Sequence, residues 1–154
     1  MSQTAQCISA GQFNEMDETV AEIFTAMLQI ECLPAHVPSA PDAEVRARVR
    51  FSGTIEGECV VSFSSEGAAS LADAFLGSVA DDAMIGDAVG ELCNMLAGAW
   101  KRRMGPEIST ASLSVPELTR GIEQADRLSQ PDTLQTYEFA STHFTVRLAF
   151  ALRS

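Results

Sequence analysis

The stretch DAVGELCNMLAGAWKRRM, which begins at Asp87, combines two carboxylates and an amide with two glycines. Asp87, Glu91 and Asn94 recur at helical spacing, so they would share one face of a helix. Carboxylates can pair with cations, and an amide can hold water by both donating and accepting hydrogen bonds. Because a glycine inside a helix costs about 1 kcal/mol relative to alanine, Gly90 and Gly98 indicate that another molecule approaches this face closely. Gly90 and Ala97 border the face, and we expect them to leave low walls beside the polar side chains.

The element that must position these side chains is a long amphipathic helix, predicted from about Asp81 to Met104. Its apolar residues fall on the side opposite the polar line and predict an inward stripe of Ile85, Val89, Leu92, Leu96, Ala99 and Trp100. Acidic residues open this helix and basic residues close it, in agreement with the helix dipole. The polar side chains are therefore expected to face outward.

The rest of the chain alternates between helical and strand patterns. A first helix is predicted from Asn14 or Asp17 to about Cys32, and a short helix at 66–77. Strands are predicted at 44–51, 58–64, 108–115, 136–141 and 143–153, with a polar stretch at 117–135. Three helices and about five strands predict a single domain, residues 1–154, with an α/β (α+β) sandwich in which an antiparallel-rich sheet packs against long helices.

The charge of the chain limits its partners. Its 154 residues carry a net charge of −11, and Lys101 is its sole lysine. Because nucleic-acid binding depends on Lys and Arg that neutralise phosphates, we expect no nucleic-acid partner. No apolar run approaches the roughly 20 residues that cross a bilayer, and the N-terminus has no signal-peptide pattern. We expect a cytoplasmic protein that does not bind membranes.

The four cysteines predict neither a metal site nor a disulfide framework. They are scattered without a CxxC pair or nearby histidines: Cys7, Cys32, Cys59 and Cys93. Such spacing favours reduced, mostly buried thiols. A Cys/His nucleophilic pair with His36 or His143 stays open, although no local signature supports one. A self-contained metal hydrolase is disfavoured because the metal-ligating residue types do not cluster.

Three arginines alternate with apolar residues in the predicted strand 44–51. Arg46, Arg48 and Arg50 would lie together on an exposed face of that strand. In a chain this acidic, we interpret them as local charge balance with nearby glutamates, or as an inter-subunit contact.

A second motif follows the helix motif further along the chain. The pattern D-x-x-x-E-x-x-N is followed by P-x-x-x-x-G, formed by Pro116 and Gly121. Together they resemble the CheC/CheX family of chemotaxis phosphatases, most closely its CheX-like branch. The stretches TAMLQIECLP and AASLADAFLG and the F-x-G-x-x-x-G hairpin also look like the family framework, so the resemblance extends over about residues 13–153.

The resemblance implies a chemistry and a partner. Members of this family remove the phosphoryl group from the aspartate of a phosphorylated CheY-type response regulator. Asn94 matches the amide that orients the attacking water, and Glu91 matches the acid that pairs with the regulator's active-site lysine. Asp87 and Pro116 match supporting positions. An acyl phosphate is already activated, so catalysis needs positioning more than covalent chemistry. Mg²⁺ would come with the regulator, so no cofactor or metal of the chain's own is expected.

Two departures from the family pattern refine this hypothesis. The 21 residues between Asn94 and Pro116 are about one fewer than the family's usual spacing, which makes the proline the weakest match. A single E-x-x-N motif, where CheC-type relatives carry two, favours the CheX-like branch. Because that branch commonly dimerises, a homodimer is expected.

The main alternative is a non-catalytic CheX-like module that docks or sequesters a response regulator, or that forms part of a motor-switch assembly. The intact pair of Glu91 and Asn94 favours the phosphatase, because a purely structural relative would not need it.

Overall fold

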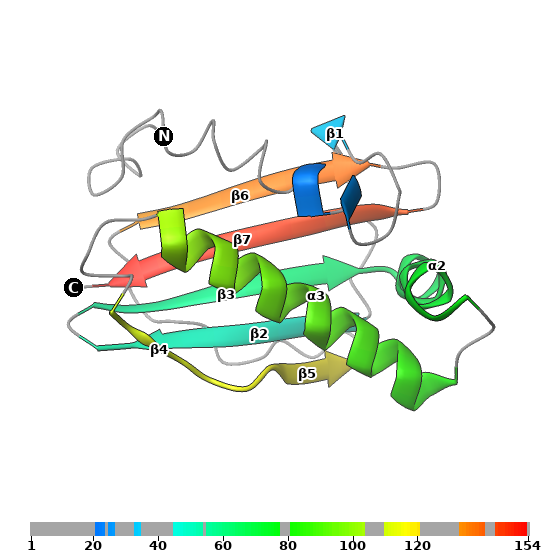
Figure 1. Cartoon of the computed structure of the whole chain (residues 1–154), viewed down its shortest axis with the longest axis horizontal. Helices are drawn as coiled ribbons and strands as arrows, with labels where there is room; N and C mark the ends of the chain where they lie inside the picture. The colour runs from blue at the N-terminus through cyan, green and yellow to red at the C-terminus, as the bar shows by residue number, and fades with distance from the viewer. Residues whose placement is uncertain are drawn as a thin grey trace.

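The fold is built on one antiparallel sheet that carries a long helix diagonally across one face (Figure 1). The computed structural model describes residues 21–23, 25–26, 33–34, 45–53, 55–77, 81–103, 110–120, 133–140 and 144–153. The strands are β1 (Leu33–Pro34), β2 (Val45–Ser52), β3 (Glu56–Phe63), β4 (Ser112–Leu113), β5 (Glu117–Arg120), β6 (Thr133–Ala140) and β7 (Thr145–Arg153). Their order is β1-β6-β7-β3-β2-β4, with β5 also paired to β2.

Two helices are described in full, and both are close to their predicted bounds. Helix α2 (Ser65–Leu76) begins after Ser64, whose hydroxyl accepts a hydrogen bond from the N–H of Gly67 at 3.0 Å. It ends at Gly77, which adopts the left-handed conformation with φ 70° that glycine tolerates best. Helix α3 (Asp82–Arg103) crosses the sheet. Residues 21–23 and 25–26 are helical, and the rest of the predicted first helix lies outside the described residues.

The predicted sandwich is confirmed, but the described residues form seven strands where about five are predicted. Strands β1 and β5 are additional, and β6 begins at Thr133, inside the predicted polar stretch. Where one strand was predicted at 108–115, the structure has only β4, and β5 lies in the predicted polar stretch. The four residues of β5 are too few, and too charged, to show a period of two. They are held instead by pairing with β2, in a register that runs from Val45↔Arg120 to Arg48↔Glu117.

The core lies between α3 and the near face of the sheet. Alternate residues of β2, β3 and β7 point into it, as the period of two requires. Trp100 of α3 is fully buried there, with its ring 5.2 Å from that of Phe51 and 4.2 Å from that of Phe150, measured between centroids. Rings at these separations contribute beyond the area that they bury. The apolar contacts therefore fix α3 against three strands.

The arginines of β2 lie on the other face of the sheet. Arg48 is buried rather than exposed, because its guanidinium lies 2.9 Å from the carboxylate of Glu117 and 3.7 Å from that of Glu58. Arg50 also reaches Glu117, at 3.4 Å. The predicted charge balance is confirmed for these two arginines, and the inter-subunit contact stays a prediction. None of the helices that the structure describes is both long and apolar enough to cross a membrane.

Candidate functional site

Acidic side chains stabilise the N-terminus of α3, the helix that carries the candidate residues. Asp81 accepts a hydrogen bond from the N–H of Met84 at 2.9 Å through Oδ1, which satisfies one of the free donors at the start of α3. Asp82 adds a negative charge in the first turn, where the helix dipole favours it. The predicted start is thus one residue from the observed one, and Met104 lies outside the described residues.

The two faces of α3 divide as predicted. Val89, Leu92, Leu96 and Trp100 are fully buried against the sheet, each with 0% of its surface exposed. On the opposite side Asp87, Glu91 and Asn94 are exposed, so the predicted outward orientation is confirmed. Within the described part of the chain, none of these three side chains forms a hydrogen bond or an ion pair. Their polar atoms are therefore exposed and without a partner among the described residues.

The expected low walls at Gly90 and Ala97 are wrong, because both residues are buried. A Cβ placed on Gly90 would lie 3.4 Å from the Cβ of Pro116, in the segment between β4 and β5. The absence of a side chain lets that segment pack on α3 instead of opening the face to a partner. The structure thus brings together two of the predicted supporting residues, beside Glu91.

A third glycine completes this contact and was not singled out from the sequence. A Cβ on the buried Gly86 would lie 2.8 Å from Cδ1 of Leu118 and 3.0 Å from Nη2 of Arg120. Arg120 also donates a hydrogen bond to the backbone carbonyl of Asp82. The four-residue spacing of Gly86 and Gly90 was the available signal, since it places both on one side of the helix. Strand β5 therefore crosses α3 at two glycines.

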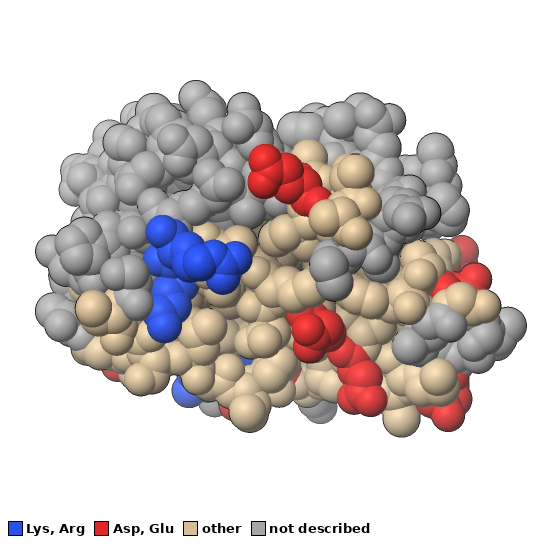
Figure 2. Space-filling view, viewed as in Figure 1, with Lys and Arg blue, Asp and Glu red and all other residues tan. Residues whose placement is uncertain are grey.

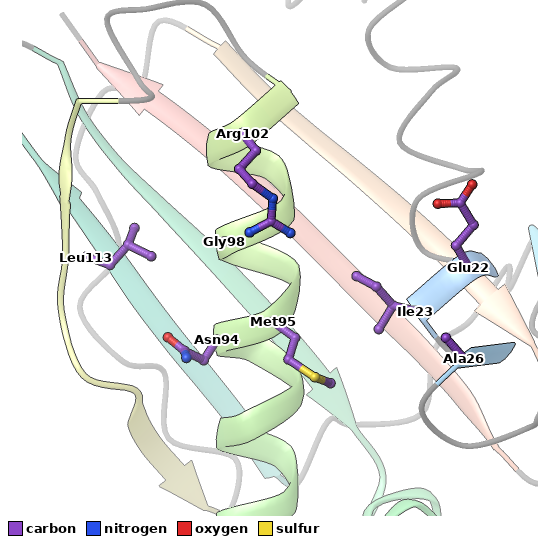
Figure 3. A pocket seen from close by; sticks show the side chains of 8 residues that line it. All are labelled: Glu22, Ile23, Ala26, Asn94, Met95, Gly98, Arg102 and Leu113. Carbon is purple, nitrogen blue, oxygen red and sulfur yellow. The ribbon is translucent and has the colours of Figure 1, made fainter.

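Gly98 does border open space. It lies with Asn94 in a groove of about 490 Å³ over the outer side of α3, and the lining residues are Glu22, Ile23, Ala26, Asn94, Met95, Gly98, Arg102 and Leu113. In Figure 3 Asn94 and Leu113 lie on one side of α3, and Met95 points to the other side, toward Ile23. The groove thus holds the amide and one predicted glycine, while Asp87, Glu91, Gly90 and Pro116 lie outside its lining.

Charge changes sign along this face. Figure 2 shows acidic atoms along the N-terminal half of α3 and basic atoms over its C-terminal end. Among the described side chains of α3, the exposed acids are Asp82, Asp87 and Glu91, and the exposed base is Arg102. Asn94, which is uncharged, lies between them in the helix. Glu22, which lines the groove from a separate segment, is exposed as well. A cation of a partner is favoured near Glu91, and an anion is favoured toward Arg102.

Behind the site, two thiols pack where α3 meets the sheet. Cys59 and Cys93 are buried and free, as predicted, and the other two cysteines lie outside the described residues. Sγ of Cys93 lies 3.4 Å from the carbonyl oxygens of both Ala47 and Cys59, so its S–H donates to backbone in the strands. Burial raises the pKa of the Cys59 thiol well above its ordinary value, and the hydrogen bond with Cys93 raises it further. A buried thiol with a raised pKa, like that of Cys59, is inert.

This arrangement suits the orientation of a small polar molecule better than covalent chemistry. A neutral amide can both donate and accept hydrogen bonds, so Asn94 can hold a water without repelling an anion beside it. A carboxylate three residues earlier is a helical neighbour, with Cβ atoms about 5–6 Å apart for this spacing. Among the described residues no three His, Cys, Asp or Glu side chains gather in a way that could hold a metal ion.

Comparison with known proteins identifies this arrangement of one long helix on an antiparallel sheet. The family described as the chemotaxis phosphatase CheX matches residues 45–138, more than half of the chain. The chain therefore belongs to the CheX family, and the resemblance predicted from the sequence is confirmed. None of the curated protein sequences compared with this chain matches it.

Solved structures share the fold. The chemotaxis protein CheX from Vibrio vulnificus has a TM-score of 0.75 at 18% identity, and the match covers 94% of this chain and 97% of that one. CheX from Desulfovibrio desulfuricans has a TM-score of 0.73 at 20% identity, covering 93% and 99%. The CheX–CheY–BeF3–Mg²⁺ complex from Borrelia burgdorferi has a TM-score of 0.68 at 15% identity, covering 93% and 98%. These matches span nearly the whole of each chain.

Proposed function

We propose that this protein hydrolyses the aspartyl phosphate of a CheY-type response regulator. The observation that carries the proposal is the exposed pair of Glu91 and Asn94, which lie one turn apart on α3 and have no partner within the described residues. Membership of the CheX family supports it, as does the shared fold of a CheX that was crystallised with CheY.

In the proposed reaction Asn94 holds a water in line with the phosphorus atom. The water attacks phosphorus, the bond from phosphorus to the aspartate oxygen breaks, and inorganic phosphate and a free carboxylate are released. The amide places the nucleophile without adding negative charge beside the phosphoryl oxygens. Because the acyl phosphate is already activated, this positioning is the main contribution asked of the helix.

Glu91 is proposed to act in docking. Its exposed carboxylate would pair with the lysine of the regulator's active site, which sets the position of α3 relative to the phosphoryl group. Asp87, one turn earlier and also exposed, would support that position electrostatically. Mg²⁺ is expected to be held by the regulator, where it would offset the charge of the phosphoryl oxygens.

Gly90 and Pro116 take a different part in this proposal from the one expected at first. Their contact holds the segment before β5 against the middle of α3, next to Glu91. This contact places Pro116 against α3 on that side, whereas Gly98 presents no side chain to the groove that it lines with Asn94. We also propose that the protein acts in the cytoplasm as a homodimer.

The proposal is tested with a set of purified response regulators, each phosphorylated with a small acyl phosphate. The protein should accelerate the loss of phosphate from at least one of them, and heat-denatured protein should not. Tight binding without any acceleration would instead identify a docking or sequestering module.

A further inference from the structure

One positively charged side chain lines the groove beside Asn94 and has no part in the reaction proposed above. Arg102 is the only basic residue among the described residues that line it. In Figure 3 its guanidinium points along α3 toward Gly98, in the direction of Asn94. This is the direction that helical side chains favour, toward the N-terminus of their own helix.

Gly98 makes the space that the guanidinium occupies. A Cβ placed on Gly98 would lie 3.6 Å from Nη1 of Arg102, so the charged group lies directly over the glycine. A long side chain at this position would fill the space between Arg102 and Asn94. Glycine at position 98 therefore allows the side chain of Arg102 to lie against the helix, in addition to allowing a partner to approach it.

No carboxylate neutralises this arginine within the described part of the chain. Arg102 is exposed and forms no ion pair there, whereas Arg48, Arg50, Arg147 and Arg153 all do. Glu22 is the one carboxylate among the described residues that line the groove, and Figure 3 shows it on a separate segment, away from the guanidinium. In a chain with a net charge of −11, a guanidinium in a groove without an ion pair to that carboxylate is suited to an anion that comes from outside. Helix-dipole stabilisation at the C-terminus of α3 would require neither the groove nor Gly98.

We infer that Arg102 binds the phosphoryl oxygens of the partner while Asn94 holds the attacking water. The two residues are eight positions apart, which is roughly 12 Å along a helix at 1.5 Å per residue. The bend of Arg102 over Gly98 takes up about one turn of that span, and a water with a phosphoryl group can occupy the rest. A planar guanidinium can donate hydrogen bonds to two oxygens at once, and this geometry matches that of the phosphoryl oxygens. This inference rests on the proposed function.

The test compares Arg102→Ala and Arg102→Lys with Lys101→Ala. Lys101 is the adjacent cation, is half-buried and does not line the groove, so it is the matched control for lost charge. Arg102→Ala should lower kcat/KM for dephosphorylation by about 10- to 100-fold, the scale of a lost hydrogen bond to a charged group. Arg102→Lys should recover part of the loss, and Lys101→Ala should change kcat/KM by less than about twofold.

A binding measurement identifies the anion. Arg102→Ala should weaken binding to the regulator loaded with Mg²⁺ and the phosphoryl mimic beryllofluoride, and should leave binding to the unloaded regulator unchanged. An equal loss for both forms would mean that Arg102 contacts a carboxylate of the regulator, and it would overturn the inference. A folded Arg102→Ala variant that behaves like Lys101→Ala would overturn it too.

The same experiment separates this inference from the function on which it rests. If the wild-type protein hydrolyses no regulator but still binds the loaded form through Arg102, the phosphatase proposal fails and the anion site stands. If the wild-type protein is active and Arg102→Ala is unaffected, the phosphatase stands and the anion site fails. If the wild-type protein binds neither form, both fail.

Discussion

Pro116 packs directly on Gly90, with 3.4 Å between the Cβ of the proline and the position that a Cβ of the glycine would take. This contact joins the segment before β5 to the middle of α3, one residue from Glu91. It leaves room at this position of the helix for a methyl group at most, so a larger side chain would have to displace the proline.

The effect of a substitution at position 90 on stability should depend on the size of the new side chain. Alanine fits at 3.4 Å, so Gly90→Ala should raise the free energy of unfolding by up to about 1 kcal/mol through helix propensity alone. Gly90→Leu should displace Pro116 and cost about 1–3 kcal/mol. Urea unfolding measures both, with Gly98→Ala as the control for propensity. A Gly90→Leu variant as stable as the wild type would show that Pro116 is not held there.

A reversed charge at position 91 should act on docking and not on folding. Glu91 is exposed, so Glu91→Lys should leave the circular dichroism spectrum unchanged. If the carboxylate pairs with a lysine of the regulator, the substitution adds a like-charge clash of several kcal/mol. KM should rise steeply and the effect should shrink at high salt. Saturation at the wild-type concentration would reject this role for Glu91.

Trp100 should dominate the attachment of α3 to the sheet. It is fully buried against Phe51 and Phe150, so Trp100→Ala should cost about 3–5 kcal/mol. Its Nε1–H finds no acceptor within the described residues. Trp100→Phe should therefore cost less than about 1.5 kcal/mol, because the ring contacts largely remain and an unsatisfied donor is removed. Equal losses in chemical unfolding for the two variants would contradict this.

The buried thiol of Cys59 should make stability fall at high pH. Its pKa is raised in the folded protein by burial first and by Cys93 second, so the unfolded chain loses the proton at a lower pH. The folded state then binds more protons above about pH 8.5, and stability declines by about 1.4 kcal/mol per pH unit for one group. Unfolding under reducing conditions from pH 8 to 10 should show a steeper decline for the wild type than for Cys59→Ala. Parallel pH profiles would exclude this contribution.

Periodicity explains how much of the fold was accessible from the sequence. The apolar stripe through Leu92 and Trp100 was long enough to give both the bounds of α3 and the direction of Asn94. The strand β5 was missed because its four residues have no period of their own and depend on pairing with β2. The wrong expectation for Gly90 has the same origin. A glycine is compatible with an open face or with a close packing contact, and only the position of Pro116, distant in the chain, decides between them.

The most direct test of the account is the rate at which Asn94→Ala dephosphorylates the true partner regulator. Asn94 is exposed and lies away from the core, so the fold should be unchanged by circular dichroism, and stability should change by under about 0.5 kcal/mol. Binding should survive because Glu91 remains. Hydrolysis should fall by roughly 10² to 10³, the scale for the loss of one preorganised polar group, and Asn94→Asp should be nearly as damaging. A folded Asn94→Ala variant that hydrolyses the phosphorylated regulator at the wild-type rate would contradict the account.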